Sequence, residues 1–166
     1  MIEIIKKMQP AEGVVITGKL SLPWELRQKR WLRTQLISGE DVALKLPRGE
    51  SLKGGDLLAT LDGSAIEVVA APEQLLHVEC ASSQELARAA YHLGNRHAAV
   101  QVGQNFLRIV EDAVLEKLLH GLGVTVTRIT APFEPETGAY GNSHDHASAV
   151  RQGQSDGSRR GGQQQE

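Results

Sequence analysis

The sequence predicts an α+β protein with a small N-terminal all-β domain, a βαββαβ domain and a disordered tail. Residues 1–71 contain short apolar runs separated by turn signals, which is typical of a small β-sandwich or barrel. Residues 72–140 change to the order strand, helix, strand, strand, helix, strand. In residues 141–166, 14 of the 26 residues are Gly, Gln or Ser. Burial there cannot offset an ordering cost of about 1–2 kcal/mol per residue.

The β-rich domain is expected to contain six short strands, most of which alternate apolar and polar side chains. The turn signal Pro47-Arg48-Gly49 closes one of them, and Asp62-Gly63 favours a tight hairpin between the last two. The composition changes at Ala70-Ala71-Pro72, where we place the domain boundary. The predicted strands are residues 2–4, 14–20, 32–36, 42–46, 57–61 and 66–70.

The second domain has two amphipathic helices among its strands. Ser82 and Glu85 form a capping box, in which the hydroxyl and the carboxylate satisfy backbone donors at the helix start. Apolar residues recur at helical spacing as far as Leu93, and Gly94-Asn95 is expected to take the left-handed conformation that ends the helix. A second helix is predicted at residues 114–122. This order matches the ferredoxin-like split βαβ arrangement, with both helices on one face of an antiparallel sheet.

Composition excludes several classes of protein. The formal net charge is -2 over 166 residues, so no global basic field exists to hold a nucleic acid. Cys80 is the one cysteine, which rules out an internal disulfide framework and a multi-thiolate metal site. No signal peptide or membrane-spanning run is recognisable. We expect a cytoplasmic protein with no nucleic-acid or membrane partner.

Four of the six histidines fall in two places. His92 lies near the predicted end of the first helix, where the helix dipole alone would account for a histidine. His97 follows a turn and opens a strand, so it should lie at a sheet end near the surface. His144 and His146 flank Asp145 in the tail. These three side chains could bind a divalent ion, or they could be incidental to the polar composition of the tail.

Imidazole nitrogen suits nickel, zinc and copper(II). A single histidine holds such an ion poorly, but a two-fold dimer would supply two copies of His97 if that residue lay near the symmetry axis. A site with so few protein ligands stays open and can exchange its metal. Structural zinc sites, in contrast, use four ligands from one fold.

The most specific motif is Tyr91-His92-Leu93-Gly94-Asn95-Arg96-His97, followed by Val100-Gln101. Over about residues 12–140, the pattern resembles the UreE urease accessory proteins, a family of nickel metallochaperones. The supporting motifs are Arg27-x-Lys29-Arg30, Leu46-Pro47-Arg48-Gly49, Leu52-x-x-Gly55-Asp56-x-Leu58 and Ala70-Ala71-Pro72-Glu73.

The resemblance implies a cytoplasmic homodimer that binds nickel(II) reversibly as cargo. It implies an N-terminal domain of a type likened to peptide-binding modules and a C-terminal domain that mediates dimerisation. His97 would bind nickel at the dimer interface, and His144 and His146 would add ligands from the tail. The implied partners are a urease accessory GTPase and the urease assembly complex, to which nickel is delivered for insertion.

The chain departs from some members of that family. Its tail carries two histidines where some members carry many, and residues 110–114 hold none of the peripheral histidines found in others. Nickel identity comes from the family alone, because zinc or copper(II) can occupy the same ligands in vitro.

Two other functions are considered. One is a peptide- or protein-binding module without a metal function, built on the β domain. The other is a metal-dependent hydrolase, which the lack of a positioned general base disfavours. The sequence has no His-Glu-x-x-His, phosphate-loop, Gly-x-Ser-x-Gly or dinucleotide motif, so we expect no enzymatic activity.

Overall fold

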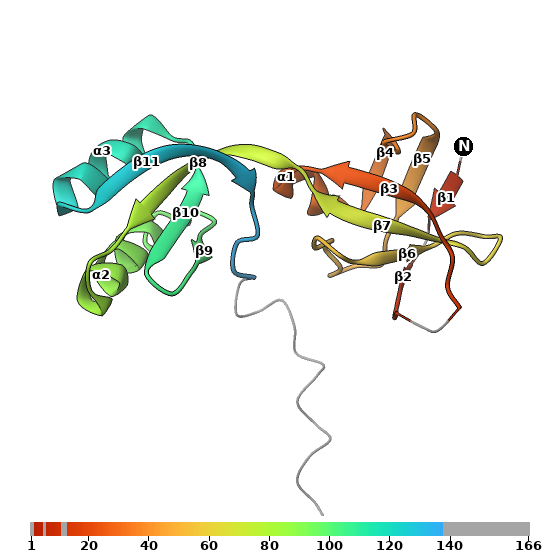
Figure 1. The fold of residues 1–166 in the computed structure, drawn as a ribbon, viewed down its shortest axis with the longest axis horizontal. Coiled ribbons are helices and arrows are strands. Elements are labelled where there is room, and N and C mark those ends of the chain that lie inside the picture. Colours follow the sequence, from red (N-terminus) through yellow and green to blue (C-terminus); the bar gives the residue numbers. More distant parts are fainter. Residues whose placement is uncertain (1, 5, 11–12, 138–166) are drawn as a thin grey trace, which may run out of the picture.

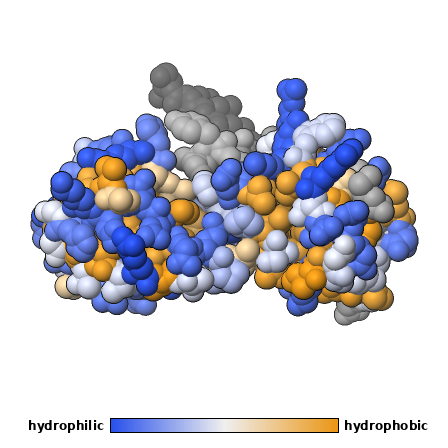
Figure 2. All heavy atoms as spheres, turned by 90° about the horizontal axis from the view of Figure 1, so that it is seen from above, coloured by the Kyte–Doolittle hydropathy of each residue, from blue (hydrophilic) through white to orange (hydrophobic). Residues whose placement is uncertain are grey.

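The computed structural model describes residues 2–4, 6–10 and 13–137 and shows two lobes, each with its own hydrophobic core (Figure 1). The predicted disordered tail, residues 141–166, lies outside these ranges. Seen from above (Figure 2), the lobes lie side by side, and apolar surface is concentrated on the N-terminal lobe at the right. None of the described helices is long and apolar enough to cross a membrane.

The described strands of the N-terminal lobe form two sheets. One has the order β1-β5-β4, in which β5 is parallel to β1 and antiparallel to β4. The other has the order β2-β6-β7-β3, in which β3 and β7 are parallel. The strands are β1 (Ile2–Ile4), β2 (Lys7–Met8), β3 (Ile16–Leu22), β4 (Trp31–Gln35), β5 (Asp41–Lys45), β6 (Leu57–Ala59) and β7 (Ala65–Ala70).

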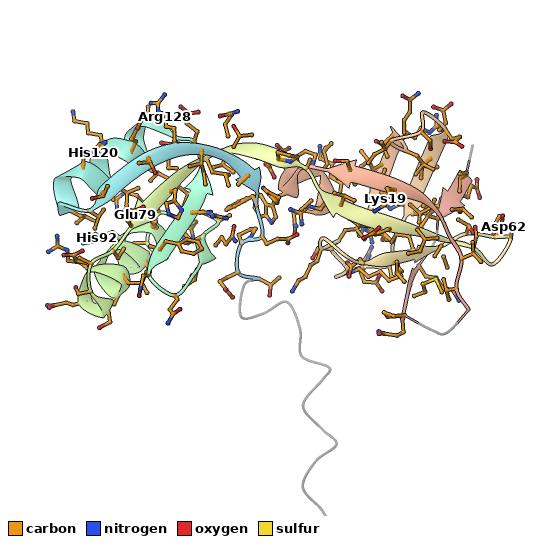
Figure 3. All side chains as sticks on the ribbon, viewed as in Figure 1. Lys19, Asp62, Glu79, His92, His120 and Arg128 are labelled. Atoms are coloured by element: carbon orange, nitrogen blue, oxygen red, sulfur yellow. The ribbon has the colours of Figure 1, made fainter. Side chains whose placement is uncertain are left out.

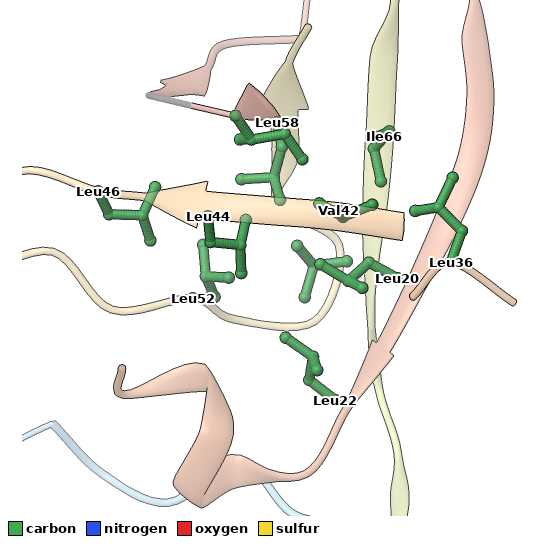
Figure 4. Packing of buried hydrophobic residues seen from close by; sticks show 11 residues of the cluster. Leu20, Leu22, Leu36, Val42, Leu44, Leu46, Leu52, Leu58 and Ile66 are labelled. Atoms are coloured by element: carbon green, nitrogen blue, oxygen red, sulfur yellow. The ribbon is translucent and has the colours of Figure 1, made fainter. Parts of the chain in front are cut away.

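Alternation along these strands builds the N-terminal core (Figure 4). Leu20 and Leu22 of β3 and Val42 and Leu44 of β5 are buried, whereas the residues between them are not, because successive strand side chains point to opposite faces. Burying each such leucine contributes about 1.5–3 kcal/mol. The predicted β-rich character of residues 1–71 is therefore confirmed.

One short helix interrupts the predicted all-β pattern. Helix α1 (Trp24–Arg27) begins after Pro23, between the predicted strands at residues 14–20 and 32–36. The φ of Pro23 is -66°, which leads readily into a helical turn. Its carbonyl accepts hydrogen bonds from the N–H groups of Leu26 and Arg27, both at 3.1 Å. This single turn places Arg27 inside the molecule.

The C-terminal lobe has the predicted βαββαβ order. Its sheet order is β11-β8-β10-β9, and every neighbouring pair is antiparallel. The apolar faces of both helices pack against one cluster that includes Leu76, Val78, Leu93, Leu107 and Leu119. The elements are β8 (Pro72–Glu79), α2 (Ser83–Gly94), β9 (Gln101–Val102), β10 (Phe106–Val110), α3 (Ala113–Leu122) and β11 (Thr125–Pro132).

Side-chain caps fix the start of both long helices. The Ser82 hydroxyl accepts the N–H of Glu85 at 3.2 Å, as the capping box predicts. The Glu85 carboxylate accepts the N–H of Ala81 at 2.9 Å, one residue before the position that the motif predicts. The Asp112 carboxylate caps α3 by accepting the N–H groups of Val114 and Leu115.

Candidate metal site at the end of helix α2

Helix α2 ends in a Schellman motif centred on His97. The N–H of Ala98 donates to the carbonyl of Leu93 at 3.2 Å, and the N–H of His97 donates to the carbonyl of Gly94 at 2.9 Å. These two bonds satisfy carbonyls that the helix end would otherwise leave free. The motif places His97 at the position where a helix usually has a left-handed glycine.

His97 takes that left-handed conformation, with φ of 54°. Among the non-glycine residues of the described ranges, it alone has positive φ. The expectation that Gly94-Asn95 ends the helix in this way is wrong, because Gly94 is helical and Asn95 is right-handed with φ of -62°. The helix ends at Gly94, and the left-handed residue comes three positions later, at His97.

The His97 ring is exposed, and within the described residues no side-chain hydrogen bond to it is formed. Beside it on the last turn of α2, Tyr91 is 66% exposed and packs edge-on against His92, with ring centroids 5.5 Å apart. Arg96 donates to the carbonyl of His92 at 3.1 Å and so braces the helix end. An unpaired imidazole and an exposed aromatic ring therefore share one end of the lobe.

The described part of one chain does not complete a metal site. It contains no group of three or more His, Cys, Asp or Glu side chains close enough to hold an ion. His144 and His146 lie outside the described residues. A metal ion at His97 would therefore need ligands from outside the described part of one chain.

The segment leading to the tail runs beside this helix end. The N–H of Glu136 donates to the carbonyl of Val100 at 2.9 Å, and Val100 is three residues after His97. An extended chain spans at most about 3.3–3.6 Å per residue. His144, seven residues beyond Thr137, can thus lie up to about 25 Å from it. The described chain therefore ends beside the segment that follows His97.

Among the other described histidines, His77 is a poor ligand candidate. Arg108 donates its Nε–H to Nδ1 of His77 at 3.2 Å, so the neutral ring carries its proton on Nε2, which faces Glu79 at 3.9 Å. Neither nitrogen of His77 then offers a free lone pair. His92 and His120 lie near the ends of two different helices (Figure 3), as expected for residues that interact with helix dipoles.

Burial also disfavours Cys80 as a ligand. Desolvation, with a smaller effect of the Glu85 charge, raises the pKa of its thiol above the usual value. The thiolate is the form that binds metals, so a raised pKa leaves Cys80 as a small apolar member of the C-terminal core.

Sequence reasoning missed Arg27, which is fully buried although it belongs to a short basic run. Its guanidinium reaches Phe133 and Glu134, which follow β11 more than a hundred residues later. The pattern around Arg27 gives no signal of this, since a basic run usually lies on a solvated face.

Comparison with known proteins identifies both lobes. Residues 2–71 match the family model described as UreE urease accessory protein, N-terminal domain, and residues 73–161 match the model of the C-terminal domain of the same family. Two similar proteins, each named urease accessory protein UreE, come from Nitrosospira multiformis and Pseudomonas fluorescens. The first is 48% identical over 143 residues, covering 86% of this chain and 81% of that protein. The second is 49% identical over 148 residues, covering 89% and 88%.

Proposed function

The chain belongs to the UreE family of urease accessory proteins, and we propose that it carries nickel(II) as cargo to the urease apoenzyme. Membership supports a role in urease maturation and not in catalysis. The finer proposal is a cytoplasmic homodimer that binds nickel reversibly through His97, His144 and His146. It docks on the urease assembly complex with an accessory GTPase and releases the ion there.

The observation that carries this proposal is the conformation of His97. A left-handed residue with a Cβ costs about 1–2 kcal/mol, and glycine avoids that cost. Nothing in the packing around His97 repays it, because the side chain is exposed and forms no hydrogen bond to the described residues. Backbone strain of this kind clusters at functional sites, so we attribute the histidine to ligand binding.

Ligand number supports a dimer. One imidazole from the described chain is too few to hold a divalent ion. A two-fold axis near His97 would supply a second imidazole from the other copy of the chain. Tyr91 offers an exposed aromatic surface at the same helix end, which suits an interface between two copies. We propose that His144 and His146 complete the coordination and leave it loose enough for transfer.

We also propose three functional parts of the chain. Residues 1–71 form the β-rich domain, which has the character of a peptide-binding module. Residues 72–140 form the metal-binding and dimerisation domain, and residues 141–166 form the tail that carries His144 and His146. The separate hydrophobic cores of the two lobes support the first division.

Calorimetric titration with nickel tests the proposal. The full chain is expected to bind about one tightly held ion per dimer, because two copies of His97 share it. His97→Ala should abolish that binding. His120→Ala is the matched control, since it removes another exposed histidine from the end of the other long helix of the same lobe. Equal stoichiometry and affinity in His97→Ala and the full chain would rule the assignment out.

A further inference from the structure

Strand β4 lies at one edge of the three-stranded sheet β1-β5-β4, so among the described strands it pairs on one side only, with β5. Figure 1 shows this sheet on the N-terminal lobe, away from the helices α2 and α3 of the other lobe. An edge strand presents unpaired N–H and C=O groups, which can pair with an extended segment of another chain. The free side of β4 therefore has the hydrogen-bonding groups of a docking surface.

The register with β5 identifies which backbone groups of β4 point outward. The antiparallel ladder continues beyond one end of β4, where the N–H of Leu46 donates to the carbonyl of Arg30 at 2.8 Å. It continues beyond the other end, where the N–H of Leu36 donates to the carbonyl of Glu40 at 2.9 Å. Residue pairs along such a ladder alternate between bonded and non-bonded. The outward-pointing backbone groups therefore belong to Trp31, Arg33 and Gln35.

These outward groups are available for pairing. Among the described residues, no backbone hydrogen bond outside the sheet ladder involves Trp31, Arg33 or Gln35. They recur at every second position, which is the spacing at which an added antiparallel strand forms its own hydrogen-bonded pairs. The edge can thus accept a further strand without breaking any bond within the sheet.

A hollow of about 380 Å³ lies beside this edge, on the outer face of the sheet. Residues of all three strands line it, including Trp31, Arg33, Ala43 and Lys45. Ala43 lies opposite Arg33 on one side and opposite Glu3 on the other. A small side chain between two longer ones keeps the hollow open.

Trp31 is an exposed aromatic residue on the same face. Its side chain is 63% exposed, and Nζ of Lys45 lies 5.3 Å from the centroid of its ring. The cation is attracted to the face of the indole ring, so Lys45 favours one position of the ring beside the hollow. Tryptophan is enriched at protein interfaces, where a rigid aromatic ring buries a large area.

The free edge also carries positive charge. Arg33 is exposed and Arg30 is half-buried just before the strand, and neither forms an ion pair within the described ranges. The carboxylate of Asp41 accepts a hydrogen bond from the side chain of Gln35 at 3.0 Å. Glu3 belongs to β1, two strands away from the edge. An acidic side chain therefore suits the position opposite Arg33.

A second copy of the chain fits this edge poorly. If two β4 strands paired about a two-fold axis centred on Arg33, the two Arg33 side chains would lie opposite each other. Like charges directly opposite one another destabilise a pair of strands. A segment of a different chain avoids this repulsion, and the charge of the edge favours an acidic one.

We propose that the free edge of β4 binds an extended acidic segment of a partner protein as an added antiparallel strand. The side chains of Trp31 and Arg33 point to the same face of the sheet. The segment therefore needs an acidic residue opposite Arg33 and, two residues later, an apolar residue opposite Trp31. This inference rests on the proposed peptide-binding character of residues 1–71, and it adds the strand that binds and the chemistry of the partner.

Amide hydrogen exchange followed by NMR on the metal-free full chain tests the proposal. The probe is the capped peptide Ser-Thr-Glu-Thr-Val-Thr-Ser, in which an acidic and an apolar residue are two positions apart. Excess peptide should slow exchange at Trp31 and Arg33 by about tenfold or more, because both amides gain acceptors. The amides of Leu32 and Thr34 face β5 and should change much less. Unchanged exchange at Trp31 and Arg33 would overturn the proposal.

Two modified peptides separate strand addition from nonspecific adhesion. N-methylation of the glutamate and valine amides removes the donors that face β4 and should abolish the protection. N-methylation of the threonine between them removes a donor that faces away from β4 and should preserve it. Equal protection by both modified peptides would show that the peptide does not add as a strand.

A charge reversal tests the chemistry of the partner. Replacing the glutamate of the peptide by lysine should weaken binding by about fivefold, and Arg33→Glu should reverse that preference. Arg48→Glu is the matched control, because it makes the same charge change at an exposed residue of the same lobe outside β4, and it should leave the preference unchanged. Equal binding of the two peptides to the full chain would overturn the acidic assignment.

The same measurement separates this inference from the metal function. Protection of Trp31 and Arg33 in His97→Ala, equal to that in the full chain, would support the edge site whatever the nickel titration shows. Absence of protection would overturn the edge site even if nickel binds through His97. Protection that rises with protein concentration in the absence of peptide would show that a second copy occupies the edge, and it would also overturn the proposal.

Discussion

His97 and Gly123 occupy equivalent left-handed positions at the ends of α2 and α3, with φ of 54° and 82°. The N–H of each donates to the carbonyl three residues earlier, at 2.9 Å for His97 and 3.0 Å for Gly123. One lobe thus ends one helix with the residue that this conformation favours and the other with a residue that it disfavours. Comparing substitutions at His97 and Gly123 therefore measures how much conformational stability the protein loses by having a histidine at the end of α2.

His97→Gly is expected to raise the free energy of unfolding of the metal-free protein by about 0.5–1 kcal/mol. Relief of left-handed strain gives about 1–2 kcal/mol, and the larger entropy of glycine in the unfolded chain removes part of it. Urea unfolding monitored by circular dichroism measures the change. His120→Gly is the control: it lies within the last turn of α3 and should destabilise by about 1 kcal/mol. A loss of stability in His97→Gly would contradict the strain argument.

Gly123→Ala should lower the free energy of unfolding by about 1–2 kcal/mol, because alanine is strained in the left-handed conformation. A Cβ added there meets no atom within 4 Å, so the loss would come from the backbone conformation alone. Gly121→Ala, two residues earlier in α3, also meets no atom within 4 Å and should stabilise by about 0.5–1 kcal/mol. Equal effects of the two substitutions in urea unfolding would show that the φ of Gly123 does not matter.

Asp112→Ala should lower the free energy of unfolding by about 0.5–2 kcal/mol, because Oδ1 of Asp112 accepts two N–H groups at the start of α3. The distances are 2.8 Å to Val114 and 2.9 Å to Leu115. Asp112→Asn keeps an acceptor oxygen and should recover most of the loss in the same unfolding assay. Nickel stoichiometry should be unchanged in both, since α3 does not carry His97.

The order of elements in the C-terminal lobe and the starts of its two helices could be predicted from the sequence, because those signals are local. Ser82 and Glu85 cap α2 in three-residue spacing, and the Asp62-Gly63 turn joins β6 to β7. The end of α2 could be predicted only in part. The helix ends at Gly94, next to its local stop signal, but the left-handed residue is His97 and not Gly94 or Asn95.

His97 was predicted as a candidate ligand, but its left-handed conformation was not predicted, although histidine is one of the non-glycine residues that adopt positive φ more often than most. The contacts of Arg27 with Phe133 and Glu134 were missed because they are long-range. Arg27 and Glu134 are separated by 107 residues, and neither periodicity nor turn chemistry connects them. Only the packed arrangement of the two lobes shows that Arg27 contacts the residues that follow β11.

Hydrogen bonds within the turn between β6 and β7 lower the pKa of the Asp62 carboxyl group. A hydrogen bond from Thr60, followed by bonds from Ser64, lowers the pKa of Asp62 from 3.8 to about 2. A carboxyl group whose pKa is lower in the folded state than in the unfolded state stabilises the fold at pH values above the unfolded-state pKa. This stabilisation is lost as the pH falls towards the pKa of the folded state.

Asp62→Asn should therefore be less stable than the unchanged chain by a constant amount above about pH 5, and the gap should close between about pH 4 and pH 2. Urea unfolding at a series of pH values measures the gap, and groups that titrate in both proteins cancel in the difference. Thr60→Val, which removes the donor with the largest effect on Asp62, should narrow the gap at neutral pH. A gap that stayed constant down to pH 2 would show that the charge of Asp62 does not contribute, and that the turn depends on its shape and not on an ionised acceptor.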